Sequence, residues 1–408
     1  MSPHALSDVL APLPYHRRTI DYLRASEGEL WDWFSSTRSL EEHARHVRLE
    51  LLKSCYRFEH AEHADLYAIV DGLRETLGLQ APVTVYQSQT AVAMNAFLSY
   101  VPGEAHVVLE GPVRATLTTD ELKATLAHEM THFLLWECDE GERLVADQLL
   151  SAMVSSDPVE MSHVESARLY RLYLEIHADR GALFAVGDPR VAVSSLIKIQ
   201  TGLADAQAES YLRQSDEIFG QTEVKAEELT HPESFIRARA LKLWSEQGQG
   251  ADGEIARMVE GPLDLGRLSL LGQQRLTELT RRVLERYLQP EWLHTQALLA
   301  HARLFFPDLA PGRGDDGSVN LRDGVAGAAE SIQRYLAYVL LDLATADRDL
   351  DEAPAAAALR LAEELGVDGP FLQMAVDEIP LTKRAASRLK KESAQIVANA
   401  ARDAEGRA

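Results

Sequence analysis

The sequence has little of three things: cysteine, positive charge and long apolar runs. Only Cys55 and Cys138 are cysteines, which excludes a disulfide framework and favours two free thiols in a reducing compartment. Asp and Glu outnumber Lys and Arg by 63 to 41, and the net charge of −22 argues against binding to nucleic acid or anionic membranes. No run reaches the length of a membrane-spanning helix, and the N-terminus lacks the apolar core of a signal peptide. We therefore expect a soluble cytoplasmic protein with no membrane and no nucleic-acid partner.

The strongest chemical signal is the segment His128–His132, which spells H-E-M-T-H. It falls in a run with a capping-box start at residues 118–121 and apolar residues at helical spacing. On a helix, His128 and His132 share one face and can hold one Zn²⁺. Glu129 lies beside them, where it can take a proton from water as a general base. The alternative is an amphipathic helix with two surface histidines, which the apolar flanks disfavour.

A catalytic zinc needs a third protein ligand, and a carboxylate on a downstream helix is a common source. Glu175 and Asp179 lie one helical turn apart, so Glu175 is the best candidate ligand and Asp179 can orient one zinc histidine. His177 is a rival, but it lies about 200° around the helix from Glu175. The alternative is that both carboxylates face solvent and pair with Arg171 or Arg180.

A small sheet is expected directly before the motif helix. Residues 21–79 have the pattern of helices, whereas 83–86, 91–100 and 106–110 have the pattern of strands, with a Pro-Gly turn at 102–103. An edge strand of this sheet can bind an extended peptide by strand addition, which suits a protease.

Four features occur in the order seen in one peptidase family. They are Asn95-Ala96-Phe97 on a strand, the motif helix, the Glu175–Asp179 pair, and Thr230-His231-Pro232 followed by Arg237. Over roughly residues 65–245 the chain resembles the zinc metallopeptidase family of the CAAX prenyl endopeptidases, the HtpX heat-shock protease and the mitochondrial Oma protease. The four features together are specific, whereas the histidine motif alone is shared by many zinc proteases.

The resemblance implies a zincin-like domain with one zinc ion. In that family the two motif histidines and the downstream Glu bind zinc and the motif Glu is the general base. By resemblance the metal ligands are His128, His132 and Glu175, and the base is Glu129.

The resemblance also implies that Asn95 and His231 steady the oxyanion or the substrate backbone, with Arg237 as support. From the residues alone, Asn95 is a turn or strand-edge side chain, and His231 is a loop residue before Pro232 at a helix start.

The chain departs from the family pattern in three respects. Many members have Gly where Thr131 stands and a second Pro where Glu233 stands, and neither position needs to touch the metal. Several well-known members have membrane helices, whereas this chain resembles a soluble branch. Their substrates are therefore not carried over.

The C-terminal part has a helical pattern from about residue 252. From about residue 325 it is similar to the helical domain of the tellurite-resistance TerB family. Its acidic turn at 347–351 alternates like the start of an EF-hand loop, but Glu352 and Ala358 replace the required Gly and Glu. The turn is either a weak cation site or an acidic helix start.

The expected fold class is α+β, mainly α-helical. We expect an N-terminal helical segment (1–64), a zincin-like metallopeptidase domain with a small β-sheet (65–250) and an all-α accessory domain (251–408). The expected function is a zinc-dependent endopeptidase that cuts soluble or unfolded proteins, with a regulatory partner bound by the accessory domain. The alternative is a non-catalytic or latent zinc-fold scaffold, or a chaperone-like module, acting through the C-terminal helices.

Overall fold

The computed structural model describes residues 6–9, 11, 13–89, 92–220, 234–310, 321–379 and 382–406. They form two compact units, Met1–Gly261 (unit 1) and Pro262–Ala408 (unit 2). The expected N-terminal segment 1–64 belongs to unit 1, and its standing as a separate domain stays a prediction.

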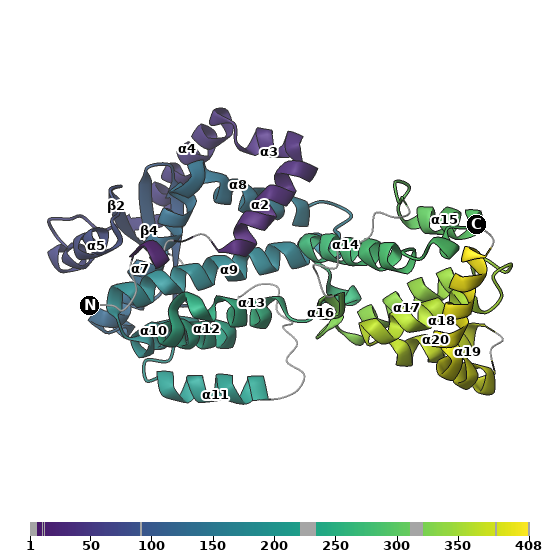
Figure 1. Ribbon diagram of the computed structural model, residues 1–408. Helices are drawn as coiled ribbons and strands as arrows, with labels where there is room; N and C mark the ends of the chain where they lie inside the picture. The colour runs from purple at the N-terminus through teal and green to yellow at the C-terminus, as the bar shows by residue number, and fades with distance from the viewer. Residues whose placement is uncertain are drawn as a thin grey trace. The chain divides into compact units, whose positions relative to one another are not determined.

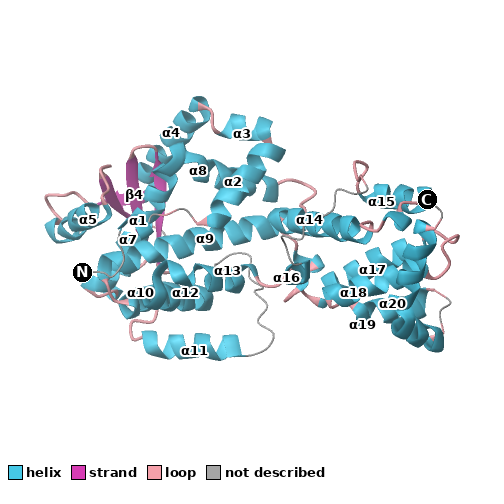
Figure 2. Ribbon diagram, viewed as in Figure 1, coloured by secondary structure: helices cyan, strands magenta, loops and turns pink. Residues whose placement is uncertain are grey.

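Unit 1 is mainly helical, with one small sheet (Figures 1 and 2). The expectation of an α+β chain dominated by helix is confirmed. The helices of unit 1 are α1 (Leu6–Val9), α2 (Pro14–Ser26), α3 (Gly28–Phe34), α4 (Thr37–Ser54), α5 (Ala64–Leu77), α6 (Val113–Thr116), α7 (Thr119–Glu137), α8 (Glu142–Val154), α9 (Met161–Val186), α10 (Pro189–Thr201), α11 (Ala208–Gly220), α12 (Ser234–Gln247) and α13 (Asp252–Glu260).

The sheet has four strands in the order β1-β2-β4-β3. Strands β2 and β4 are parallel, whereas β1 pairs with β2 and β3 pairs with β4 in antiparallel fashion. The three strands expected from the sequence are confirmed, and β3 and β4 are joined by the expected turn. The strands are β1 (Cys55–Arg57), β2 (Val83–Ser88), β3 (Asn95–Val101) and β4 (Glu104–Glu110).

Strand β1 corrects the expectation that residues 21–79 form helices only. Its three residues extend because Cys55 and Arg57 align with Ser88 and Tyr86 of β2. Such a short strand depends on its neighbour rather than on its own sequence, so period-based analysis cannot find it. At the opposite edge of the sheet, β3 has no second strand partner among the described residues.

Gly111 shapes the chain just after β4. Its φ is +59°, and a Cβ there would lie 2.7 Å from the carbonyl oxygen of Ala93. The backbone that leads into β3 thus approaches the end of β4 more closely than any side chain permits. This close approach of the two backbone segments fixes the position at which β3 begins.

Helix α7 begins where the sequence predicts. The Thr118 hydroxyl accepts a hydrogen bond from the Glu121 N–H, and the Glu121 carboxylate accepts one from the Thr118 N–H. Glu121 also pairs with buried Lys198 of α10 at 2.8 Å. The start of the motif helix is therefore held by its own cap and by a buried ion pair to a neighbouring helix.

Helices α7 and α9 approach each other closely at Thr131 and Gly181. A Cβ on Gly181 would lie 1.9 Å from Thr131 Oγ1. Thr131 is fully buried, and its hydroxyl donates to the Ala127 carbonyl at 2.7 Å. Thr131, which departs from the glycine common in the resembled family, is thus accommodated by a glycine on the facing helix.

Unit 2 is all helical in its described residues and has its own aliphatic core. Leu336, Leu340 and Leu359 are fully buried there. The glycine-rich stretch 311–317, whose sequence predicts a flexible loop, lies outside the described residues. The helices of unit 2 are α14 (Leu270–Tyr287), α15 (Gln296–Phe305), α16 (Leu321–Val325), α17 (Glu330–Thr345), α18 (Ala353–Leu365), α19 (Asp368–Glu378) and α20 (Lys383–Glu405).

Candidate metal centre

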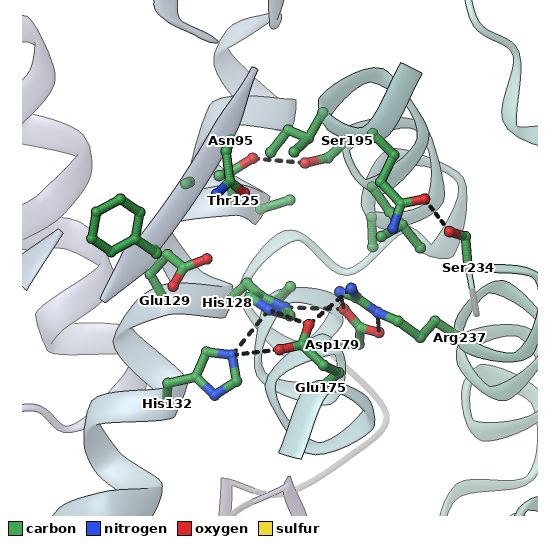
Figure 3. A pocket seen from close by; sticks show the side chains of 18 of the residues that line it. Asn95, Thr125, His128, Glu129, His132, Glu175, Asp179, Ser195, Ser234 and Arg237 are labelled. Atoms are coloured by element: carbon green, nitrogen blue, oxygen red, sulfur yellow. Dashed lines mark hydrogen bonds and ion pairs between the residues drawn. The ribbon is translucent and has the colours of Figure 1, made fainter. Parts of the chain in front are cut away.

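Two helices bring the predicted ligand residues together. His128 and His132 project from α7, and Glu175 projects from α9 toward them (Figure 3). The two Nε2 atoms lie 3.2 Å apart. Glu175 Oε2 lies 3.4 Å from His128 Nε2, and Glu175 Oε1 lies 3.4 Å from His132 Nε2. Three potential ligand atoms from distant parts of the chain thus face one point.

These separations fit a zinc ion. Ligand atoms bonded to a tetrahedral zinc at about 2.0–2.1 Å lie about 3.3–3.4 Å from one another. Two imidazoles and one carboxylate also form a donor set used by catalytic zinc sites, which leave a fourth position for water. Among the described residues, no other group of three His, Cys, Asp or Glu side chains has this clustering, and the acidic turn at 347–351 does not.

Asp179 and Arg237 form a second layer behind the ligands. His128 Nδ1 donates to Asp179 Oδ1 at 2.9 Å, which leaves Nε2 to face the centre. Arg237 of α12 donates to both Asp179 oxygens at 2.8 and 2.6 Å, and its Nη1 lies 2.8 Å from Glu175 Oε2. The Asp179 side chain is 6% exposed and that of Arg237 is 9% exposed, so this ion pair is shielded from water.

The carboxylates around His128 favour the charged form of its imidazole. Burial by itself lowers the pKa of this imidazole, but its hydrogen bonds to Asp179 and Glu175 raise it to about 10. Burial also disfavours the charged form of Glu175, yet Arg237 and the two histidines hold the pKa of its carboxyl well below the usual range. A divalent cation held here would replace a proton, because histidine binds a metal through a deprotonated nitrogen.

Glu129 lies beside the histidines and lines the same cleft (Figure 3). It is 6% exposed, and burial raises the pKa of its carboxyl. Among the described residues it makes no hydrogen bond or ion pair, in contrast with Glu175 and Asp179. Its carboxylate is therefore available for proton transfer.

The centre lies in a cleft of about 1120 Å³ that strand β3 borders. Asn95, at the start of β3, lines this cleft, and its side-chain amide donates to Glu110 Oε2 at 3.2 Å. The structure thus brings Asn95 to the site but gives its side chain a partner. His231 lies outside the described residues.

The alternative pairings of Glu175 and Asp179 are wrong. Arg180 pairs with Asp252 at 2.6 Å, and Arg171 pairs with Asp147 at 3.6 Å. His177 is fully buried on another face of α9 and does not line the cleft, as its position on the helix predicts.

Sequence reasoning missed several residues of the cleft. Asp147 and Arg171 line it, as does Ser195 of α10, whose hydroxyl lies 2.7 Å from that of Thr125. The four-residue spacing of Arg171, Glu175 and Asp179 is a signal that could have identified Arg171. No local signal identifies Asp147 or Ser195, because other helices bring them to the cleft.

None of the described helices combines the length and the apolar character that a membrane span requires.

Comparisons with known proteins agree with this centre. Residues 60–159 match Peptidase family M48, a span that contains both motif histidines and Glu129 and ends before Glu175. The chain is 29% identical over 201 residues to the plastoglobule-localized metallopeptidase 48, chloroplastic, of Arabidopsis thaliana. That alignment covers 45% of this chain and 57% of the relative, so the chain spans little more than half of the relative's length. No solved structure matches the chain. The expected resemblance to a metallopeptidase family is confirmed for residues 60–159, the region that matches family M48. The narrower likenesses to CAAX, HtpX, Oma and TerB proteins stay predictions.

Proposed function

We propose that this protein is a zinc-dependent endopeptidase of the zincin type. The observation that carries the proposal is the set of separations between His128, His132 and Glu175, which suits one tetrahedral zinc. The match of residues 60–159 to a metallopeptidase family supports the same reaction class.

His128, His132 and Glu175 would hold the ion, which when bound supplies a Lewis acid that activates water and polarises a carbonyl. Asp179 fixes the tautomer of His128, and Arg237 keeps Asp179 and Glu175 ionised. Glu129 accepts a proton from the attacking water and passes it to the leaving amine. Burial, which raises the pKa of the Glu129 carboxyl, brings that group closer to the range in which a general base is efficient.

The substrate is a soluble or unfolded protein segment in extended conformation. The free edge of β3 borders the cleft and offers backbone groups for strand addition. Asn95 and His231 steady the substrate backbone or the oxyanion in this proposal. A regulatory protein partner binds the TerB-like helices, and the protein acts in the cytoplasm.

Zinc content and proteolysis test the proposal together. Purified full-length protein should contain about one zinc per chain and should cleave an unfolded protein. Glu129→Gln should retain the zinc and lose cleavage by at least about a hundredfold, because proton transfer contributes that much. Glu217→Gln, at an exposed position on α11, is the matched control and should cleave like the wild type.

Glu175→Ala should lose zinc. Full zinc occupancy in that variant would overturn the assignment of the third ligand, and cleavage that survives Glu129→Gln would overturn the mechanism. The scaffold alternative predicts stable complexes and no turnover. It is less well supported, because a scaffold has no use for a buried carboxylate such as Glu129 beside the ligands.

A further inference from the structure

Two arginines line the cleft, and their side chains differ in exposure to solvent. Among the described residues that line it, Arg171 and Arg237 are the only Lys or Arg side chains. Arg237 is 9% exposed and is engaged by Asp179 and Glu175. The Arg171 side chain is 47% exposed. Arg171 is therefore the cation that a bound molecule can reach.

The guanidinium of Arg171 is held from one side. Its Nη2 donates to Ser151 Oγ at 2.9 Å, and its Nε lies 3.6 Å from Asp147 Oδ1. Both partners belong to α8, so they fix the orientation of the planar group while nearly half of the side chain remains open to solvent. An arginine oriented in this way loses little freedom when it binds a carboxylate.

Arg171 lies one helical turn from the candidate ligand Glu175 on α9. It precedes Glu175 by four residues on α9, which is one turn and about 6 Å along the helix axis. An extended peptide advances about 3.3 Å per residue. A group bound by Arg171 therefore lies about two residues from the peptide bond at the centre.

We propose that Arg171 is a specificity-determining residue that binds a carboxylate of the substrate about two residues from the cleaved bond. The proposal rests on the endopeptidase function proposed above and names the substrate class: acidic peptide segments. Arginine binds carboxylates through paired, charge-assisted hydrogen bonds, which favours Asp or Glu over the amide of the same shape.

The opposite arrangement at Asn95 makes the preference directional. Asn95 and Glu110 are register partners at the beginning of β3, and both line the cleft. The other end of β3 lies on the side of His132, since the Tyr100 ring contacts that of Trp136, which lies 6.0 Å from the ring of His132. Asp147, the partner of Arg171, also lies near His132, so Arg171 and Asn95 are at opposite ends of the cleft. A substrate carboxylate near Glu110 meets a like charge. Only the Arg171 side of the cleaved bond should therefore favour an acidic residue.

Octapeptides that differ at a single position test the proposal. One set has an amidated C-terminus and carries Glu or Gln at each position in turn, and a second set carries Gln throughout with a free or amidated C-terminus. The first set detects a side-chain carboxylate and the second a terminal one. Wild-type protein should cleave the preferred Glu peptide with kcat/KM about tenfold above its Gln counterpart.

Binding provides a readout that does not depend on turnover. Fluorescence anisotropy with the zinc-loaded Glu129→Gln protein should show a similar preference for the carboxylate peptide. The preference should shrink as salt rises, because the guanidinium is partly exposed.

Arg171 variants decide the matter. Arg171→Gln should reduce the ratio of kcat/KM between the Glu and Gln peptides to about one. Arg171→Glu should favour a peptide with Lys at the same position. Arg190→Gln removes an exposed arginine of α10 that does not line the cleft, so it is the charge-matched control and should keep the tenfold ratio. Equal binding and cleavage of Glu and Gln peptides by the wild type would overturn the role of Arg171 and leave the proteolytic mechanism intact. Absence of peptide binding would overturn it as well, and absence of zinc and of all cleavage would instead count against the proposed function.

Discussion

The two units bury different kinds of side chain. In unit 2, Asp347 is the one Asp, Glu, Lys or Arg that is buried among the described residues, and the core around it is aliphatic. The described residues of unit 1 include eight such buried side chains, which are Glu121, Glu129, Arg143, Glu165, Asp179, Arg180, Lys198 and Arg237.

A buried charge is costly unless it is paired, and apolar residues of the same volume usually serve stability as well or better. The aliphatic core of unit 2 follows this rule. Unit 1 departs from it mainly around α7, α9 and α12, which form the candidate centre. The comparison indicates that the buried charges of the cleft region serve the chemistry of the candidate centre rather than the stability of the fold. Four predictions test it, from the largest expected effect to the smallest.

Arg237→Leu should cost about 3–5 kcal/mol of the free energy of unfolding in the presence of a chelator. It leaves the buried Asp179 carboxylate and the partly exposed Glu175 carboxylate with one cationic imidazole, that of His128, as a shared partner. Urea unfolding gives the value. Arg286→Leu in unit 2 removes an exposed pair with Glu364 and should cost less than about 1 kcal/mol. Equal costs for the two variants would remove the distinction between the units.

Leu340→Ala should cost about 2–5 kcal/mol, because it opens a cavity in the core of unit 2. The affinity for zinc, measured by competition with a chelator, should not change. Leu304→Ala, at a position that is 78% exposed, should cost less than about 0.5 kcal/mol. A loss of zinc affinity in Leu340→Ala would show that the two cores are not independent.

Gly181→Ala should cost about 1–3 kcal/mol, since the added methyl group overlaps Thr131 and forces α7 and α9 apart. Gly72→Ala in α5 has open space around its Cβ and should instead stabilise the protein by up to about 1 kcal/mol. Thermal unfolding of the two variants measures these opposite changes in stability.

The double variant Thr131→Gly/Gly181→Ala should recover part of the loss, because it moves the small residue from one helix to the other. If the double variant is no more stable than Gly181→Ala, the contact with Thr131 is not the cause of the loss.

His16 should make the stability of unit 1 depend on pH. It is fully buried in α2 against the ring of Tyr170, and burial together with nearby Arg143 lowers its pKa to about 3. Between that value and the ordinary pKa of about 6.5 only the unfolded chain binds the proton. The contribution of neutral His16 is therefore complete above about pH 6.5 and is lost progressively as the pH falls.

The slope is at most about 1.4 kcal/mol per pH unit. Urea unfolding of wild type and His16→Phe at pH 4 to 7 should show a shallower slope for the variant. His60→Phe, at an exposed position, should keep the wild-type slope. Parallel curves for wild type and His16→Phe would rule out this contribution.

Local patterns predict the parts of the centre that lie within single helices. The cap at Thr118 and Glu121 and the spacing of His128 and His132 within α7 need no tertiary information, and the structure has both. The convergence of Glu175 on the histidines depends on how α9 packs against α7, and the family resemblance, together with the downstream carboxylate spacing, pointed to it. Strand β1 escaped prediction because its residues extend only through pairing with β2.

Contacts between distant segments explain the remaining differences. The bond between Asn95 and Glu110 follows from the register of β3 and β4, which the strand sequences do not reveal. Arg237 reaches Asp179 across 58 positions in the chain, so only the family pattern singled it out. The orientation of the Arg171 guanidinium depends on Ser151 and Asp147, which α8 supplies.

The bond from Arg237 to Asp179 also sets an order of events in the cell. A ribosome completes both histidines, Glu175 and Asp179 well before it reaches residue 237, because the chain grows from its N-terminus. During that interval the carboxylates of Glu175 and Asp179 lack the guanidinium of Arg237. The part of the cleft wall that α12 contributes through Phe235 is also still missing. A nascent chain thus contains the histidine motif before it can form the complete candidate metal centre. The cleft is therefore complete only after α12 has been made.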